Sequence, residues 1–328
     1  YSCRKKTGKQ YAFSTNCGIY LYNIQSGETI PVKTDGGYDT DPVFSADGKH
    51  LAWISMRRDG YEADQQRIMV CDFENGTACR TRQLAASLDR DASGLVWSPD
   101  SKGLYYSALH NGVQKLFYTT LEDNTRQLTS DEEKYDFFSP FGVLDGGRTL
   151  LASNYCLNRP VELISLSVED EGYAQWKALT DENGHILSQL DEPTSESIWL
   201  ETVDGKQMQC WVLYPPHFDP SKQYPGIEIV LGGPQGTNSQ DWSYRWCYRL
   251  MAQQGYVVIM PNRRGTTAFG QEWKEQISGD YPGLNMQDYL TAGRWLKSRD
   301  YIGKLACVGA SYGGYSVYML EGLHGDLY

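Results

Sequence analysis

Short alternating runs of apolar and polar residues recur through the first 190 residues. The runs begin at residues 19, 68, 116 and 162, and the intervals between them are 49, 48 and 46 residues. Ser-Pro-Asp and Asp-Gly turns separate them, which is typical of short strands joined by hairpins. A repeat of this length built from short strands indicates β-propeller blades. Only the first part of the fourth repeat is present before the pattern ends. We therefore expect an incomplete propeller over residues 1–190, with blades missing before Tyr1.

The pattern changes near residue 191, where a polar connector covers residues 191–197. Two alternating runs then flank Asp204 and Gly205, which predicts a hairpin. After it, apolar strand-like runs alternate with amphipathic helical segments; the strands are predicted at 227–231, 256–260 and 305–309, and the helices at 241–254 and 285–299. This alternation predicts a mostly parallel, doubly wound sheet over residues 191–328. Catalytic groups belong at the carboxyl ends of such strands.

The run Gly309-Ala310-Ser311-Tyr312-Gly313 joins the last predicted strand to a helical segment. This is the Gly-x-Ser-x-Gly pattern of the nucleophile elbow of an α/β-hydrolase, in which a tight turn projects the serine hydroxyl from the sheet. We expect the turn to require glycine at Gly309 and Gly313, because a Cβ at either position would collide with a neighbouring strand or helix. The alternative is a Gly-Ser-Gly loop without chemical importance. We predict that Ser311 is a nucleophile.

Two backbone N–H groups are expected to bind the oxyanion that forms when a serine attacks a carbonyl. The N–H of Tyr312 is one candidate, because it follows the nucleophile directly. The second candidate is the N–H of Gly233 in the loop Gly232-Gly233-Pro234, where a substrate could approach the backbone closely. An ordinary glycine turn is the alternative for that loop.

The general base is harder to find, because only 17 residues follow Ser311. His324 lies 13 residues further on, roughly 20 Å along a continuing helix, so we expect it at the helix end and out of reach. The other histidines fall in the repeats or after the hairpin, and we expect them at surfaces or turns: His50, His110, His185 and His217. The acid and the histidine of a triad are therefore expected outside this chain.

Several charged residues near the predicted sheet have two interpretations. Arg263 and Arg264 could bind a carboxylate or could fix their loop through ion pairs, and the second interpretation is favoured. Asp280 and Asp288 are expected to be local loop and helix partners rather than catalytic acids.

Charge and composition argue against a few classes of binding partner. A net charge of −11 and a pI near 5.0 disfavour nucleic acid and anionic membranes as partners. No apolar run reaches membrane-spanning length, and the chain begins at Tyr1 without a signal segment, as a processed product or a piece of a longer protein would. No cysteine or histidine spacing suggests a metal site, and no cofactor is expected.

The eight cysteines leave their redox state open. Cys71 and Cys79 flank an Asn-Gly turn and could face each other across a hairpin as a disulfide. Cys3 and Cys17 could form a second pair. Free thiols are the alternative for all of them, and Cys307 in the predicted elbow strand is expected to be a small buried apolar residue.

Taken together, these motifs resemble the prolyl oligopeptidase family of serine peptidases, most closely its dipeptidyl peptidase 5 and acylaminoacyl-peptidase-like branch in Bacteroidota. The motifs that carry the resemblance are the elbow around Ser311, the Gly232-Gly233-Pro234 loop and residues 262–270, in a chain whose repeats contain Ser-Pro-Asp and Asp-Gly turns. Leu231 occupies the position before the two glycines at which many members of the family have a histidine.

The resemblance implies a β-propeller followed by an α/β-hydrolase domain, both incomplete here. It implies a periplasmic homodimer that removes dipeptides from the N-termini of short peptides through an acyl-enzyme on Ser311, with Tyr312 and Gly233 as oxyanion donors and the propeller limiting access. The alternatives are an acylaminoacyl peptidase or esterase on the same scaffold, or a propeller binding protein without catalysis.

Overall fold

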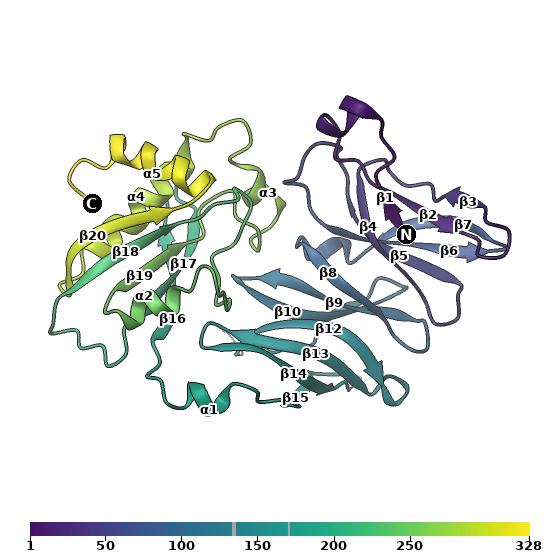
Figure 1. Ribbon diagram of the computed structural model, residues 1–328, viewed down its shortest axis with the longest axis horizontal. Coiled ribbons are helices and arrows are strands. Elements are labelled where there is room, and N and C mark those ends of the chain that lie inside the picture. Colours follow the sequence, from purple (N-terminus) through teal and green to yellow (C-terminus); the bar gives the residue numbers. More distant parts are fainter. Residues whose placement is uncertain (133–135, 170) are drawn as a thin grey trace. The chain divides into compact units, whose positions relative to one another are not determined.

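The structure is a computed structural model that describes residues 1–132, 136–169 and 171–328 (Figure 1). The chain divides into two compact units. Unit 1 contains residues 1–110, 114–154 and 162–180, and unit 2 contains residues 111–113, 155–161 and 181–328. The assignment of residues 1–190 to a propeller and of residues 191–328 to a hydrolase domain stays a prediction.

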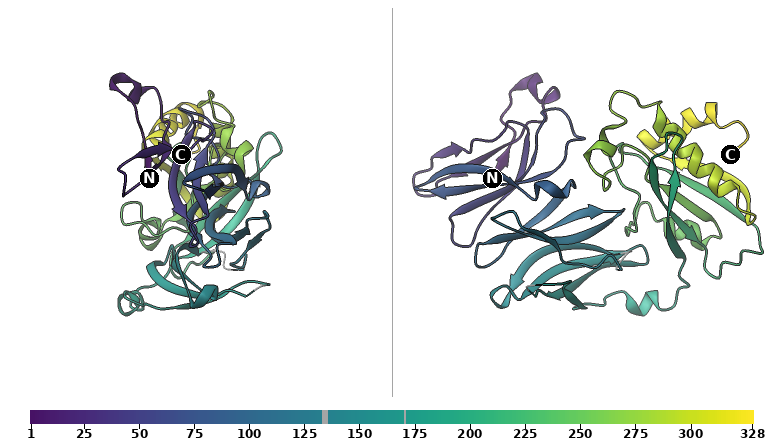
Figure 2. Two further views of the ribbon diagram at one scale, coloured as in Figure 1. Left: turned by 90° about the vertical axis from the view of Figure 1, so that its right-hand side faces the viewer. Right: turned by 180° about the vertical axis from the view of Figure 1, so that it is seen from behind.

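Unit 1 is built from small sheets in which strands that follow one another in sequence are neighbours (Figures 1 and 2). The first sheet has strands β1 (Ser2–Cys3), β2 (Gly18–Tyr22) and β3 (Thr29–Pro31). The second has β4 (Tyr38–Phe44), β5 (His50–Met56), β6 (Arg67–Glu74) and β7 (Thr77–Leu84). The third has β8 (Ala92–Trp97), β9 (Gly103–His110), β10 (Val113–Thr120) and β11 (Thr125–Gln127). The fourth has β12 (Phe137–Leu144), β13 (Thr149–Cys156), β14 (Arg159–Ser167) and β15 (Gln175–Ala178).

Three short 3-10 helices interrupt these strands: η1 (Gly8–Ala12), η2 (Ala86–Leu88) and η3 (Asp145–Gly147). The predicted repeat is visible as sheets of four strands. Its starting residues 68, 116 and 162 fall in β6, β10 and β14, the third strand of each sheet, so one repeat in the sequence combines the end of one sheet with the start of the next.

Apolar side chains join successive sheets of unit 1. Val70 of the second sheet and Tyr106 of the third are buried in one core, and Leu116 of the third and Phe138 of the fourth are buried in another. Successive sheets thus bury apolar side chains against one another, and their arrangement as propeller blades stays a prediction. Among the described residues no sheet closes on itself.

The cysteines suggested as disulfide partners are free thiols in the structure. The ladder between β6 and β7 shifts register between Val70 and Asp72, so that Cys79 pairs with Asp72 rather than with Cys71. Burial raises the pKa of the Cys71 thiol to about 11, which keeps it protonated at neutral pH. Cys3 and Cys17 are also unbonded, so the alternative of free thiols holds for both pairs.

Unit 2 contains a five-stranded sheet in the order β16-β17-β19-β18-β20. Its strands are β16 (Thr194–Glu201), β17 (Gln207–Tyr214), β18 (Tyr224–Val230), β19 (Val257–Pro261) and β20 (Ile302–Gly309). The first two form the predicted hairpin, and β17 runs antiparallel to β19. The strands β19, β18 and β20 are parallel to one another, as predicted.

The helices of unit 2 are α1 (Gly184–Leu187), α2 (Tyr248–Gln253), α3 (Gln271–Glu275), α4 (Leu284–Lys297) and α5 (Tyr312–Leu323). Val230 on β18 packs with Tyr289 of α4 and Leu320 of α5. Because side chains alternate along a strand, its neighbour Ile229 points to the opposite face, where it lines a pocket with Met251 of α2. Helices therefore cover both faces of the sheet, as a doubly wound fold requires.

Two boundaries in unit 2 differ from the sequence prediction. The connector predicted at 191–197 becomes strand from Thr194 onward, because polar side chains are tolerated on β16, an edge strand whose backbone pairs with β17. The helix predicted at 241–254 forms only as α2, residues 248–253. Before it, the Ser243 hydroxyl accepts hydrogen bonds from the N–H groups of Arg245 and Trp246, which favours a turn over a helix.

Candidate active site

The turn between β20 and α5 holds Ser311 in an uncommon backbone conformation, with φ at 56° and ψ at −124°. Positive φ is costly for a residue with a side chain and is found where surrounding structure enforces it. Two glycines make the turn possible. A Cβ on Gly309 would lie 2.5 Å from the carbonyl oxygen of Val230, and a Cβ on Gly313 would lie 2.2 Å from the same oxygen. The local geometry is that of a nucleophile elbow.

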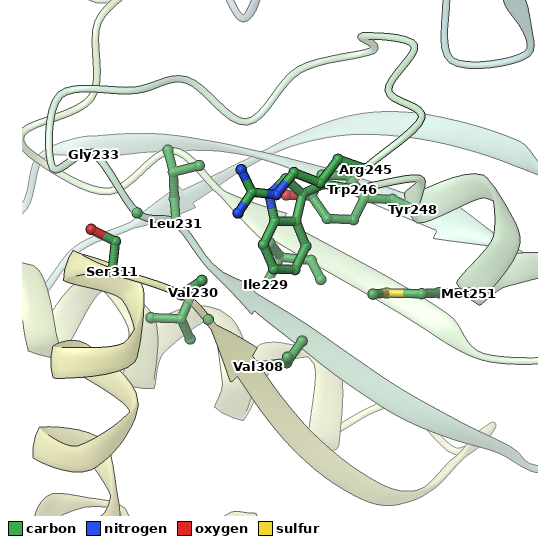
Figure 3. Close-up of a pocket in the computed structure, with 13 residues that line it drawn as sticks. Ile229, Val230, Leu231, Gly233, Arg245, Trp246, Tyr248, Met251, Val308 and Ser311 are labelled. Carbon is green, nitrogen blue, oxygen red and sulfur yellow. The ribbon is translucent and has the colours of Figure 1, made fainter.

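Ser311 is exposed at the carboxyl end of β20, beside a pocket of about 320 Å³ (Figure 3). The pocket lining is mainly apolar: Ile229, Val230, Leu231, Gly232, Gly233, Arg245, Trp246, Tyr248, Met251, Val308, Gly309, Ala310 and Ser311. Arg245 is the charged member of this lining, and its guanidinium lies over the Trp246 ring. Sequence analysis did not select these two residues, because the segment before α2 was expected to be helical.

The loop after β18 lies directly against the elbow. A Cβ on Gly232 would stand 2.6 Å from the carbonyl oxygen of Ala310, so only glycine permits this approach. Gly233 has φ at 128°, and a Cβ there would lie 2.7 Å from the backbone nitrogen of Gln235. The structure thus brings Gly233 and Ser311 to one pocket from strands that are neighbours in the sheet, as Figure 3 shows.

Tyr312 begins α5 and is held by its side chain. Its hydroxyl accepts a hydrogen bond from the Asn285 side chain and donates one to the carbonyl of Tyr281 at 3.4 Å. Burial raises the pKa of the Tyr312 phenol to about 12, so it stays neutral. Because its side chain is anchored, the backbone N–H at the first position of the helix has a fixed direction, as an oxyanion donor needs. No sequence motif identified Asn285 as a partner of Tyr312.

The two arginines that follow β19 have different surroundings. Arg264 forms ion pairs with Asp204 and Asp288, so the structural interpretation holds for it and for Asp288. Arg263 donates instead to the Tyr289 hydroxyl at 2.9 Å and to the Pro234 carbonyl at 2.9 Å. It therefore contacts the loop that contains Gly233.

The histidine expected at the end of the last helix lies there. His324 is the C-terminal cap of α5, and its Nδ1 accepts a hydrogen bond from the N–H of Tyr328. The prediction that it belongs to the helix end is confirmed. Among the described residues that line the pocket there is no histidine and no carboxylate. The roles of Ser311, Tyr312 and Gly233 stay predictions.

The described residues contain no group of three or more His, Cys, Asp or Glu side chains arranged to hold a metal ion. Within the same residues, no helix is long and apolar enough to cross a membrane.

Comparison with known proteins gives relatives over nearly the whole chain. The chain is 45% identical over 329 residues to dipeptidyl-peptidase 5 of Porphyromonas gingivalis, an alignment that covers 99% of this chain and 46% of that protein. It is 30% identical over 306 residues to dipeptidyl-peptidase 5 of Trichophyton schoenleinii, with 92% of this chain and 41% of that protein covered. The chain thus spans about half the length of the curated relatives that it matches.

Solved structures share the fold at low sequence identity. An acylaminoacyl peptidase of Pyrococcus horikoshii superposes with a TM-score of 0.74 at 19% identity, over 93% of this chain and 45% of that one. Dipeptidyl peptidase 4 of Porphyromonas gingivalis superposes with a TM-score of 0.63 at 15% identity, over 95% of this chain and 51% of that one. The sequence model of the prolyl oligopeptidase family matches residues 242–328, which include the elbow with Ser311. The motifs, the relatives and this match agree on a similarity to the prolyl oligopeptidase family.

Proposed function

We propose that this chain supplies the nucleophile and the oxyanion-binding groups of a serine exopeptidase that releases dipeptides from the N-termini of short peptides. The observation that carries the proposal is the exposed Ser311 at a positive φ between β20 and α5, packed against a double-glycine loop. The names of the relatives at 45% and 44% identity, both dipeptidyl-peptidase 5, support the choice of dipeptides as products.

In the proposed reaction the Ser311 hydroxyl oxygen attacks the carbonyl carbon of the second residue of the peptide. The hydroxyl proton passes to a general base and then to the departing amine, and an acyl-enzyme on Ser311 is left. The negative charge on the carbonyl oxygen is stabilised by the N–H groups of Tyr312 and Gly233. Water then attacks the acyl-enzyme and releases the dipeptide.

The apolar pocket gives this reaction a place for a substrate side chain. Its wall combines strand residues such as Ile229 and Val308 with Met251 of α2, and it opens beside Ser311. Burial of an apolar side chain contributes binding free energy of about 1.5–3 kcal/mol. We therefore propose that short peptides with apolar residues next to the cleaved bond are preferred.

We also propose that the sheets of unit 1 are blades of a β-propeller that limits access to short peptides. The support is the repeat of four-stranded sheets and the apolar cores that join each sheet to the next. A periplasmic location and a homodimer stay predictions that follow from the family resemblance.

A second candidate function is hydrolysis of acylaminoacyl peptides or simple esters. The observation in its favour is the fold likeness to an acylaminoacyl peptidase, with a TM-score of 0.74. The same nucleophile and oxyanion groups would serve both reactions, since the two differ in what holds the end of the substrate rather than in the chemistry at the carbonyl. A third alternative, a binding protein without catalysis, would leave Ser311 unreactive.

The test is made in the complete polypeptide that carries this chain. A fluorophosphonate probe is expected to label Ser311, as mapped by mass spectrometry of the labelled peptide. Initial rates are then measured on matched dipeptidyl, acetyl-aminoacyl and ester substrates. Highest kcat/KM on the dipeptidyl substrates supports the proposal, whereas highest kcat/KM on acetyl-aminoacyl substrates selects the second candidate.

The control variant is Ser221→Ala, which removes another exposed serine hydroxyl of unit 2, one that bonds only to Asp219 in the loop before β18. Labelling and turnover are expected to be unchanged in it. A folded protein that shows no labelling at Ser311 and no turnover on any of the three substrate classes would contradict the proposed function and would select the binding protein.

A further inference from the structure

Arg263 is fully buried at the carboxyl end of β19. Its Nε donates to the Tyr289 hydroxyl at 2.9 Å, one terminal nitrogen donates to the Arg264 carbonyl at 2.9 Å, and the other donates to the Pro234 carbonyl at 2.9 Å. That second nitrogen also has a longer contact of 3.5 Å with the carbonyl of Leu231. Every one of these acceptors is neutral.

The neighbouring arginine makes the contrast clear. Arg264 is equally buried and faces two carboxylates, those of Asp204 and Asp288. Arg263 keeps its charge, because an arginine side chain does not lose its proton in proteins. A buried charge without an opposite charge is costly unless surrounding dipoles compensate for it. The resting structure therefore holds a buried positive charge that is balanced by backbone carbonyls and one phenol.

The position of that charge relates it to the oxyanion loop. The Leu231 carbonyl belongs to the peptide group directly before the Gly232–Gly233 peptide, and the Pro234 carbonyl belongs to the second peptide group after it. A guanidinium that bonds both of them holds the short segment between them, which contains the proposed Gly233 N–H donor. Tyr289 adds a contact, because its hydroxyl donates to the Leu231 carbonyl at 3.3 Å.

The same guanidinium also lies beside the second proposed donor. Its central carbon is 5.0 Å from the centre of the Tyr312 ring, within the range of a cation–π contact. Arg263 thus contacts the loop of one oxyanion donor and the side chain of the other. A planar fork of donors suits this arrangement, whereas a lysine ammonium could not span it.

We propose that Arg263 is a positioning residue for the oxyanion site: it orients the Gly233 N–H, and it places a buried positive charge behind the oxygen that becomes negative in the reaction. This inference rests on the proposed function of Ser311. Its consequence is that the effect of Arg263 falls on the charged tetrahedral state and hardly at all on binding of a neutral carbonyl, since only an interaction that is stronger in the transition state raises kcat.

The experiment compares Arg263→Gln and Arg263→Lys with the parent in the complete polypeptide. The matched control is Arg249→Gln, the same change at another buried arginine of unit 2, whose guanidinium bonds the Asn158 carbonyl. Each variant is assayed for kcat and KM on a dipeptidyl substrate and for inhibition by two ligands. The first is a dipeptide boronic acid, which adds the serine oxygen to form a tetrahedral anion. The second is the corresponding dipeptide alcohol, in which a neutral CH₂OH group replaces the carboxyl group, so that no anion forms.

For Arg263→Gln we expect kcat to fall by about 10²–10³, the effect of losing an oxyanion-site donor, while KM changes by less than about threefold. Binding of the boronic acid should weaken by a similar factor, and the dipeptide alcohol should bind as before. Arg263→Lys should keep the charge without the fork and lose about tenfold or more in kcat. Arg249→Gln should match the parent in kcat and in both inhibition constants.

Three outcomes would count against the inference or its basis. A folded Arg263→Gln or Arg263→Lys enzyme with parental kcat would overturn the role of Arg263 while leaving the function of Ser311 intact. Equal weakening of binding for the boronic acid and the dipeptide alcohol would show that Arg263 is only a structural support, and would overturn the proposal. Turnover that survives Ser311→Ala would overturn the proposed function, and the inference with it. Should Arg263→Gln fail to fold, the kcat and the two inhibition constants of Arg263→Lys decide.

Discussion

Arg264 and Asp288 of unit 2 form a buried ion pair with two hydrogen bonds. The Nε and one terminal nitrogen of Arg264 donate to the two oxygens of the Asp288 carboxylate, at 2.8 Å and 2.9 Å. The pair joins the loop after β19 to α4, and Asp204 in the hairpin turn between β16 and β17 adds a second carboxylate to the same guanidinium. The loop that also contains Arg263 is thereby tied to α4 and to the hairpin turn.

We expect Asp288→Ala to lower the free energy of unfolding by about 3–5 kcal/mol, because it leaves a buried guanidinium with only part of its counter-charge. Urea unfolding followed by circular dichroism measures this. The control is Asp219→Ala, which removes an exposed carboxylate 3.7 Å from Lys222 and should cost at most about 1 kcal/mol. Equal losses in the two variants would show that burial of the Arg264 pair does not matter.

Ser311→Ala is expected to abolish hydrolysis and to leave the fold intact. Removal of the triad serine costs roughly 10⁶ in kcat in subtilisin, and the exposed Ser311 side chain makes no packing contact that alanine would lose. Turnover and thermal unfolding are measured side by side. A variant that kept more than about a hundredth of the parental kcat would show that Ser311 is not the nucleophile.

Gly233→Val is expected to lower kcat/KM by about 10²–10³ on a dipeptidyl substrate. The Cβ would lie 2.7 Å from the nitrogen of Gln235 and 3.0 Å from that of Gly236, at a backbone φ of 128° that side chains rarely adopt, so the loop must shift. Gly322→Val is the matched control, since Gly322 is exposed on α5 with no atom within 4 Å of the Cβ position. The assignment of Gly233 is refuted by an enzyme that keeps its kcat/KM.

Glu228→Gln is expected to change how stability depends on pH. Burial on β18 raises the pKa of the Glu228 carboxyl to about 8, and Tyr328 donates a hydrogen bond to it at 2.8 Å. The folded protein therefore binds this proton more tightly than the unfolded chain, whose glutamate pKa is about 4.3. The stability from this group is complete below that value and is lost as the pH rises toward 8, at about 1.4 kcal/mol per pH unit at most.

The measurement is the urea midpoint of parent and variant at pH 5, 6, 7 and 8. The difference in stability between Glu228→Gln and the parent should grow in favour of the variant as the pH rises, because glutamine stays neutral throughout. Other groups contribute equally to both proteins and cancel in this difference. Parallel curves over the whole range would contradict the raised pKa.

Much of unit 2 could be predicted from the sequence, because its signals are local. The helix α4 was expected from Tyr289, Leu290, Gly293 and Leu296, whose spacing puts them on one face, and it forms at Leu284–Lys297. The elbow at Ser311 was predicted for the same reason, since two glycines within five residues and a strand before them decide that turn. The spacing of the repeats likewise predicted sheets of four strands in unit 1.

Only the tertiary structure decided which partners the polar side chains find. Arg263 and Arg264 are adjacent and chemically identical, and the sequence favoured ion pairs for both. The fold gives two carboxylates to Arg264 and gives the carbonyls of the oxyanion loop to Arg263. Those partners lie 24 and 60 residues away from Arg264, and 29 and 32 residues away from Arg263. Turns and helices follow from interactions within a few residues, whereas the balance of a buried charge depends on which distant segments pack around it, and that is set only when the strands assemble into the sheet.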